Sequence, residues 1–257
     1  MSQIDAPIAV FDSGLGGVSV LREMRKIMPG EDFYYYGDSL NAPYGTKTLY
    51  GVRKLTIAHT RDFIEMGAKG VVVACNTATS AAVRTLREMY PQLPLVGIEP
   101  AVKPAVEAFP HGRILVMATP MTIREEKLHK LIERFAGEAE VIPLACPGLM
   151  DFVEAGNIDS PEIYGFLRDI LHPYKGNLDA VVLGCTHYPF VQKTIQEVLG
   201  EKVQIFDGGE GTAKEIKRRL SVAGLLQNNA QRKGEIIYKN SDNSQEKEAL
   251  FWKLLNY

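Results

Sequence analysis

Two cysteines occupy matching positions at the ends of two apolar segments. The run Val181–Gly184 leads directly into Cys185, the run Val71–Ala74 leads into Cys75, and polar residues follow each thiol. A thiol has an ordinary pKa of about 8.5, so a modest shift lets it accept or donate a proton near neutral pH. We therefore interpret the two cysteines as halves of one active site, each delivered by the end of a strand.

Other roles for these cysteines are less consistent with the pattern. A packed core cysteine has no need of polar residues directly after it, and zinc requires about four ligands at a spacing that this chain lacks. A cysteine hydrolase pairs one thiol with an imidazole base. His187 could serve Cys185 in that way, but Cys75 would remain unexplained. Cys146 is followed by Pro147 rather than by polar residues, so we interpret it as structural.

The first apolar run, Ile8–Phe11, ends at Asp12 and Ser13 and is followed by the glycine-rich segment Gly14–Gly17. Glycines after a strand are typical of dinucleotide sites, but Ser19 replaces the third glycine and a carboxylate stands where a pyrophosphate would bind. A tight turn that enters a helix explains the same glycines, and Asp12 could simply begin that helix.

A set of neutral hydrogen-bonding side chains also follows predicted strands. Asn76, Thr77, Thr119 and Thr186 form a group suited to binding carboxylate or ammonium groups. Each of the remaining polar candidates has an alternative that the residues alone leave open. Thr122 with Glu125 matches a helix capping box, Glu154 could be an exposed helix carboxylate, and His187 could be a hydrogen-bonded histidine without a catalytic role.

Apolar runs and helix-like periodicity alternate along the chain. The pattern predicts strands at 8–11, 32–36, 71–74, 95–98, 114–117, 140–145, 181–184 and 203–206, with an edge or hairpin-like strand at 235–239. It predicts helices at 18–28, 47–66, 78–89, 99–109, 122–135, 148–155, 161–171 and 191–199, one capped by Thr212 and Glu215, and one at 245–254. This alternation is typical of an α/β fold with parallel sheets, in which ligands gather at the carboxyl ends of strands.

The alternation restarts at Arg113. The separation along the sequence between the two cysteine segments is nearly the same as that between the first strands of the two parts. We expect two similar Rossmann-like, doubly wound domains that face each other across a cleft. The first would comprise residues 1–98 and 208–257, and the second residues 99–207. This division would place Cys75 and Cys185 on opposite walls of the cleft.

Bulk composition narrows the class of protein. The 257 residues include 29 basic and 31 acidic side chains without a run of one sign, which argues against a nucleic-acid partner. No apolar stretch is long enough to span a membrane, and no signal-peptide pattern is present. Three cysteines form an odd number without short spacings, which indicates reduced thiols and a cytoplasmic protein.

Several motifs resemble those of the cofactor-independent aspartate/glutamate racemase family. They occur in the family's order in the segments 11–17, 42–45, 74–79, 145–147, 153–154 and 184–189. The resemblance implies racemisation of glutamate without a cofactor or metal. It also implies a homodimer and a supply of D-glutamate for peptidoglycan. Racemisation of aspartate, amino-acid binding without chemistry, and thiol redox chemistry are the alternatives.

The same resemblance assigns roles to individual residues. It implies that Cys75 and Cys185 are the two bases and that Asp12, Glu154 and His187 assist them. The implied substrate contacts are Asp12, Ser13, Tyr44, Gly45, Asn76, Thr77, Thr119, Thr122, Thr186 and His187.

Overall fold

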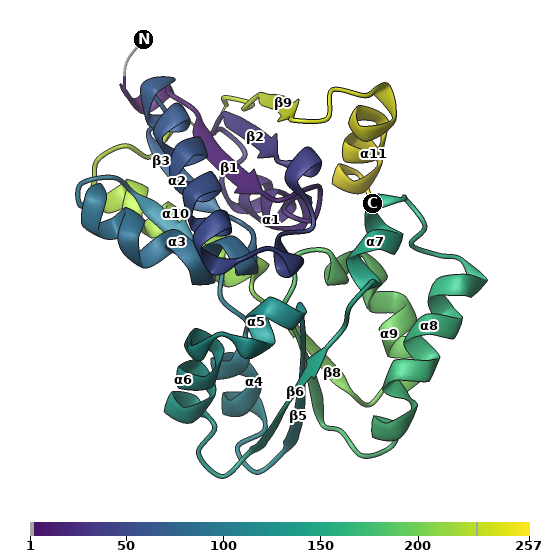
Figure 1. The fold of residues 1–257 in the computed structure, drawn as a ribbon. Helices are drawn as coiled ribbons and strands as arrows, with labels where there is room; N and C mark the ends of the chain where they lie inside the picture. Colours follow the sequence, from purple (N-terminus) through teal and green to yellow (C-terminus); the bar gives the residue numbers. More distant parts are fainter. Residues whose placement is uncertain (1–2, 230) are drawn as a thin grey trace. The chain divides into compact units, whose positions relative to one another are not determined.

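The computed structural model describes residues 3–229 and 231–257 of the chain. The chain divides into two compact units: unit 1 contains the residues up to Ile98 together with Gly209–Tyr257, and unit 2 contains Glu99–Gly208. Each unit contains a parallel sheet with helices packed on it (Figure 1). The predicted α/β class with two parallel sheets is therefore confirmed. Among the helices described, none is both long and apolar enough to cross a membrane.

In unit 1 the sheet order is β4-β3-β1-β2-β9, with every neighbouring pair parallel. The strands are β1 (Ile8–Asp12), β2 (Phe33–Gly37), β3 (Gly70–Val73), β4 (Leu95–Gly97) and β9 (Ile236–Asn240). The edge position predicted for residues 235–239 is confirmed, but the hairpin-like alternative is wrong. β9 pairs in parallel with β2, a strand about two hundred residues earlier in the chain, so no tight turn joins them.

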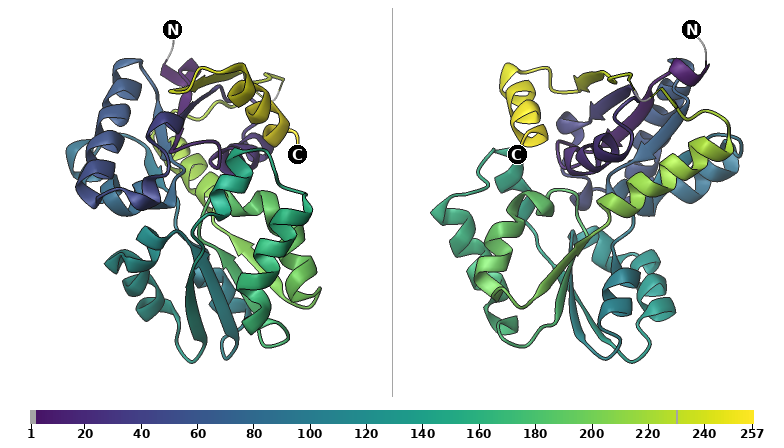
Figure 2. Two further views of the ribbon diagram at one scale, coloured as in Figure 1. Left: turned by 45° about the vertical axis from the view of Figure 1, so that its right-hand side comes forward. Right: turned by 180° about the vertical axis from the view of Figure 1, so that it is seen from behind.

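The helices of unit 1 cover both faces of this sheet (Figures 1 and 2). They are α1 (Val18–Ile27), α2 (Leu49–Glu65), α3 (Asn76–Met89), α10 (Gly209–Val222) and α11 (Gln245–Leu255), with short 3-10 turns η1 (Gln3–Asp5), η2 (Ser39–Asn41) and η3 (Tyr44–Thr46). α1 packs with α10 and α11, while α2 packs with α3. Burial from both sides explains why β1 and β3 consist of continuous apolar runs.

In unit 2 the sheet order is β6-β5-β7-β8, again entirely parallel. The strands are β5 (Arg113–Ala118), β6 (Glu140–Ala145), β7 (Ala180–Leu183) and β8 (Gln204–Asp207). The helices are α4 (Val102–Ala108), α5 (Pro120–Arg124), α6 (Glu126–Phe135), α7 (Leu149–Glu154), α8 (Pro161–Leu171) and α9 (Gln192–Leu199), with 3-10 turns η4 (His172–Tyr174) and η5 (Tyr188–Val191). The central strands β5 and β7 are buried, whereas the edge strands β6 and β8 are partly exposed.

The two sheets share one topology. In each, the second strand of the unit lies beside the first, and the third and fourth follow on the other side: β2-β1-β3-β4 in unit 1 and β6-β5-β7-β8 in unit 2. This order places a topological switch point between the first and third strands, where open α/β sheets bind their ligands. Cys75 follows β3 and Cys185 follows β7, so the two thiols occupy equivalent places in their units.

Two capping predictions are wrong. The side chain that caps α5 is Thr119, which accepts a hydrogen bond from the backbone N–H of Thr122, so Thr122 lies inside the helix. Thr212 also lies inside its helix, because α10 already begins at Gly209. In both cases a threonine three residues before a glutamate matched the capping pattern, but the helix begins earlier in the chain than that threonine.

Gly37 provides a test of the packing at the end of β2. A Cβ atom at this position would lie 2.5 Å from the Gly14 carbonyl oxygen and 2.6 Å from Nδ2 of Asn240. We expect Gly37→Ala to lower the free energy of unfolding by about 2–3 kcal/mol, because backbone and buried atoms would have to move. Chemical denaturation measures the effect. The control Gly165→Ala, in open space on α8, should be neutral or stabilise by about 0.5–1 kcal/mol. Equal stability of Gly37→Ala and the unmodified protein would contradict this packing.

Candidate active site

The carboxyl end of β1 presents a buried carboxylate. Asp12 is fully buried, and its Oδ2 accepts a hydrogen bond of 2.9 Å from the backbone N–H of Gly17. A Cβ on Gly17 would lie 2.7 Å from the Asp12 Cβ, so only glycine fits where the chain turns toward α1. The glycine-rich segment therefore has a structural reason in this fold: its last glycine brings a backbone N–H to the Asp12 carboxylate where a side chain would collide.

Cys75 caps the next helix at the switch point. It is the N-cap residue of α3, and its Sγ accepts a 3.5 Å hydrogen bond from the N–H of Ala78. The Oγ of Ser13 lies 3.5 Å from the same sulfur. The amino end of a helix carries partial positive charge, so this position stabilises an anionic sulfur. The thiol is 6% exposed and can meet a small molecule without being solvated as a surface thiol is.

Asn76 carries the strongest sign of a ligand in unit 1. Its side chain is 4% exposed, and within the described part of the chain neither its amide nitrogen nor its amide oxygen has a hydrogen-bond partner. A buried amide without partners costs about 1–3 kcal/mol, so such a group calls for a polar partner that binds there. Asn76 stands directly after Cys75, and Thr77 is buried beside it.

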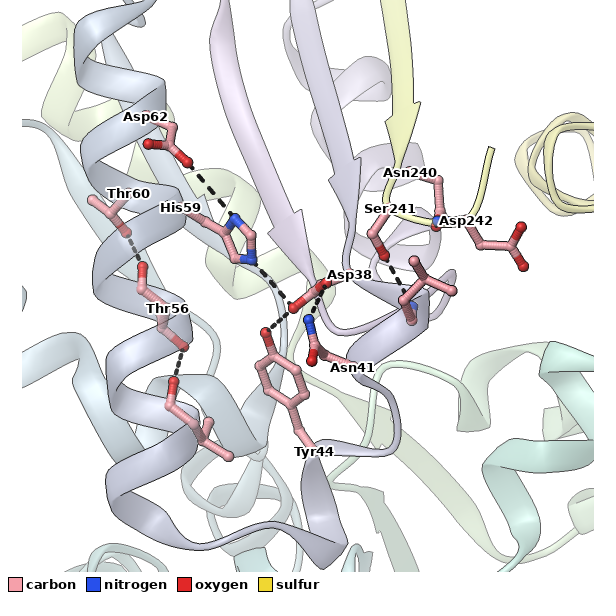
Figure 3. Close-up of polar contacts among 12 residues, drawn as sticks. Asp38, Asn41, Tyr44, Thr56, His59, Thr60, Asp62, Asn240, Ser241 and Asp242 are labelled. Atoms are coloured by element: carbon pink, nitrogen blue, oxygen red, sulfur yellow. Dashed lines mark hydrogen bonds and ion pairs between the residues drawn. The ribbon is translucent and has the colours of Figure 1, made fainter. Parts of the chain in front are cut away.

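Tyr44 and Gly45 are buried in η3, but the tyrosine hydroxyl is already engaged. It donates a 2.7 Å hydrogen bond to Oδ2 of Asp38, as Figure 3 shows. Burial, followed by the hydrogen bond to Asp38 and the negative charge of that carboxylate, raises the pKa of Tyr44 well above its ordinary value, so the hydroxyl stays protonated. The Tyr44 ring lies 6.3 Å from that of Phe11, the residue before Asp12, and η3 packs against α3, which Cys75 caps.

In unit 2 a histidine links a thiol to a carboxylate. Nδ1 of His187 lies 3.6 Å from the Cys185 sulfur, and Nε2 lies 2.8 Å from Oε1 of Glu154 on α7. Burial lowers the pKa of His187, but the hydrogen bonds and charges of Cys185 and Glu154 outweigh burial and raise that pKa well above its usual value. The imidazole is therefore held as a cation between two groups that it can neutralise.

The threonines of unit 2 lie at the same end of the sheet. The hydroxyls of Thr119 and Thr122 are 3.0 Å apart and buried, and Thr186 is buried directly after Cys185. Thr119 follows β5 and Thr186 follows β7, and these strands are paired neighbours. The hydroxyls therefore gather at the switch point of unit 2, as Asn76 and Thr77 gather in unit 1.

Cys146 differs from the other two thiols. Its Sγ donates a 3.6 Å hydrogen bond to the carbonyl of Leu144, its own chain neighbour. Burial, with a contribution from nearby Cys185, raises the pKa of Cys146 to about 12, so it remains a neutral thiol. This environment favours the packing role expected from its sequence.

The structure thus divides the candidate residues between the two switch points. Unit 1 holds Asp12, Ser13, Tyr44, Gly45, Cys75, Asn76 and Thr77, and unit 2 holds Thr119, Thr122, Glu154, Cys185, Thr186 and His187. Two residues missed by the sequence analysis join the first group: Asp38 and its partner His59. The sequence contained a sign of Asp38, because this carboxylate comes just after a predicted strand region, as Asp12 does. It contained no sign of His59.

Comparisons with known proteins find relatives of the whole chain. The model of the Asp/Glu/Hydantoin racemase family matches residues 9–216. The chain is 50% identical to a glutamate racemase of Clostridium perfringens, over 92% of this chain and 91% of that protein. It is similar in structure to the glutamate racemase isoform RacE1 of Bacillus anthracis, with a TM-score of 0.87 and 31% identity over 98% of this chain and 94% of that one. It is also similar to an Escherichia coli glutamate racemase solved with L-glutamate, with a TM-score of 0.83 and 29% identity over 98% and 94% of the two chains.

Proposed function

Because the chain belongs to the Asp/Glu/hydantoin racemase family, we propose that it interconverts L- and D-glutamate by moving the α-proton between two cysteines. Membership makes it a racemase, which is an isomerase. The choice of glutamate is supported by the curated relatives, which at 46–50% identity carry that name. The observation that carries the mechanism is the equivalent placement of Cys75 and Cys185, each at a switch point beside a group that stabilises a sulfur anion.

The proposed reaction balances one proton removed against one proton supplied. The thiolate of one cysteine takes the α-proton and becomes a thiol, while the thiol of the other cysteine donates its proton to the opposite face of the carbanion and becomes a thiolate. The products are the other enantiomer and an enzyme whose two sulfurs have exchanged protonation states. The mechanism therefore requires Cys75 and Cys185 to reach opposite faces of the α-carbon, and each enantiomer has its own base.

The remaining candidates have roles consistent with their contacts. The His187 cation, paired with Glu154, faces the Cys185 sulfur, and the amino end of α3 faces the Cys75 sulfur. We propose that Asp12, at the end of the strand beside β3, assists Cys75 in proton transfer. We propose that Ser13, Tyr44, Gly45, Asn76, Thr77, Thr119, Thr122 and Thr186 hold the substrate. Charge that develops on the α-carboxylate needs such hydrogen-bond donors, since no cofactor is proposed to take it up.

Solvent exchange tests this proposal directly. In D₂O containing a chelator, a reducing agent and no pyridoxal phosphate, L-glutamate should lose its optical signal and D-glutamate should lose its own at a matching rate. Mass spectrometry should find one deuterium in the inverted product. Binding of glutamate without exchange would identify a binding protein instead. Activity that disappears with reducing agent would identify thiol redox chemistry.

Substrate choice is tested with the same assay. Glutamate and aspartate differ by one methylene, a difference worth about 1–3 kcal/mol in a fitted pocket. We expect kcat/KM for glutamate to exceed that for aspartate by about 10–100-fold. A preference for aspartate would replace the proposed substrate and keep the proposed chemistry.

We further propose a cytoplasmic homodimer whose D-glutamate enters peptidoglycan synthesis. The motif resemblance supports the assembly and the pathway, and the free thiols at all three cysteines support a reducing compartment.

A further inference from the structure

A second buried carboxylate in unit 1 stands outside the roles proposed so far. Asp38 directly follows β2 and is 1% exposed. Figure 3 shows donors from three segments converging on it. Its Oδ2 accepts from the Tyr44 hydroxyl at 2.7 Å and lies 3.2 Å from Nε2 of His59, and its Oδ1 accepts from Nδ2 of Asn41 at 3.0 Å.

Asp38 is ionised in this setting. Burial raises its pKa, but the hydrogen bonds from His59, Tyr44 and Asn41 outweigh burial and lower the pKa of Asp38 to about 2. A buried anion is stable only where donors surround it, so the carboxylate and its donors constrain one another. Loss of one donor therefore weakens the hold on the others.

Backbone hydrogen bonds connect this anion to the candidate site. The N–H of Asp38 donates to the carbonyl oxygen of Asp12 at 3.0 Å, and the N–H of Asn41 donates to the carbonyl of Asp38 at 3.0 Å. The segment from Asp38 to Tyr44 is thus attached at its first residue to Asp12, and at its last residue the Tyr44 hydroxyl binds back to the Asp38 carboxylate.

The end of β9 holds the other side of the same segment. The N–H of Leu40 donates to Oγ of Ser241 at 2.9 Å, and Nδ2 of Asn240 donates to Oγ of Ser39 at 3.0 Å. These contacts fix η2. In η3 the Tyr44 ring packs near that of Phe11 and the turn packs against α3, while the Asp38 carboxylate receives the hydrogen bond of the Tyr44 hydroxyl.

His59 is the donor from α2 and is itself held in place. Its ring packs against the stacked rings of Phe11 and Tyr36, with centroids 5.2 Å and 4.8 Å away. Its Nδ1 is 4.0 Å from Oδ2 of Asp62, the next turn of the helix. Because packing already orders this ring, its Nε2 can donate to Asp38 with little further loss of conformational entropy. His59 can therefore hold the carboxylate in one orientation.

We propose that Asp38 and His59 are positioning residues, which fix the Tyr44–Gly45 turn for substrate binding. This inference rests on the proposed assignment of Tyr44 and Gly45 as substrate contacts. Neither Asp38 nor His59 needs to touch glutamate. The His59 imidazole orients the Asp38 carboxylate, and this carboxylate orients the Tyr44 side chain and thereby fixes the position of the turn.

The test compares two substitutions at one position. His59→Leu keeps a partly buried apolar side chain but removes the donor, whereas His59→Gln can place an amide N–H near the position of Nε2. With His59→Leu we expect KM to rise about 5–20-fold for both enantiomers while kcat changes less than about 3-fold, because the thiols keep their surroundings. His59→Gln should restore most of the affinity. Equal KM values for His59→Leu and the unmodified protein would overturn the proposal, as would a Gln variant no better than Leu.

Hydrogen exchange supplies a readout that needs no activity. Amides of residues 39–48 should exchange faster in His59→Leu than in His59→Gln, while those of β1 and β3 stay unchanged. Tyr44→Phe should loosen the same segment, and its effect should not add to that of His59→Leu, since both act through one carboxylate. Additive effects, or an unchanged segment, would overturn the positioning role. Absence of racemisation by the unmodified protein would instead refute the proposed function, and exchange would still decide whether His59 fixes the turn.

Discussion

Alanine at Cys75 or at Cys185 is expected to lower kcat for glutamate racemisation by at least about 10³-fold, because inversion needs a proton acceptor on one face and a donor on the other. A positioned acid or base contributes about 10²–10⁴-fold, and the third thiol, Cys146, is held neutral by burial and cannot take over as the base. Circular dichroism of L- and D-glutamate measures the loss.

The two variants should fail in different ways. With Cys75→Ala, Cys185 remains able to remove and return the α-proton of the enantiomer that it faces. We expect that enantiomer to acquire deuterium from D₂O slowly without inverting, while the other stays unlabelled. Cys185→Ala should show the opposite selectivity. Proton NMR of the α-position distinguishes the four cases.

Cys146→Ala is the matched control, because this thiol is held neutral by burial and bonds to its own backbone neighbourhood. It should keep kcat within about 3-fold of the unmodified protein. Racemisation by Cys75→Ala or Cys185→Ala at the unmodified rate would remove that sulfur from the mechanism, and total loss in Cys146→Ala would bring a third sulfur into it.

The second prediction concerns the effect of Glu154 on the protonation of His187. The pKa of His187 is raised by its hydrogen bonds and charge interactions with Cys185 and Glu154, which outweigh burial. A raised pKa means that the imidazolium is fully present below the ordinary value and is lost as pH rises through the raised one. Racemisation that depends on this cation should therefore extend into the alkaline range.

Glu154→Gln removes the negative charge and should lower the pKa of His187. The alkaline limb of kcat/KM should then move to lower pH, and activity at pH 8 should fall about 10–100-fold, with a smaller loss at pH 6. Glu133→Gln, on the exposed surface of α6, is the control and should leave the profile unchanged. A uniform loss at every pH would show that Glu154 acts without setting the charge of His187.

Local sequence patterns were sufficient to predict which residues end the central strands. Apolar runs such as Val71–Val73 and Val181–Leu183 are favourable only where helices cover both faces, and the polar residues that follow must leave the sheet at its carboxyl end. For this reason the α/β class, the two parallel sheets and the placement of Asp12, Cys75 and Cys185 at strand ends could be read from local pattern.

The pairing of polar groups from distant segments, in contrast, depends on the three-dimensional packing. The contact between His59 and Asp38 joins a helix to a strand end, and β9 finds β2 across most of the chain. No local pattern specifies such pairs, because a histidine on a helix face has the same local signature whether its partner is a buried carboxylate or water. The capping errors at Thr122 and Thr212 have the same origin: a hydroxyl caps a helix only if the chain enters there, and that path is set by the packing of the whole unit.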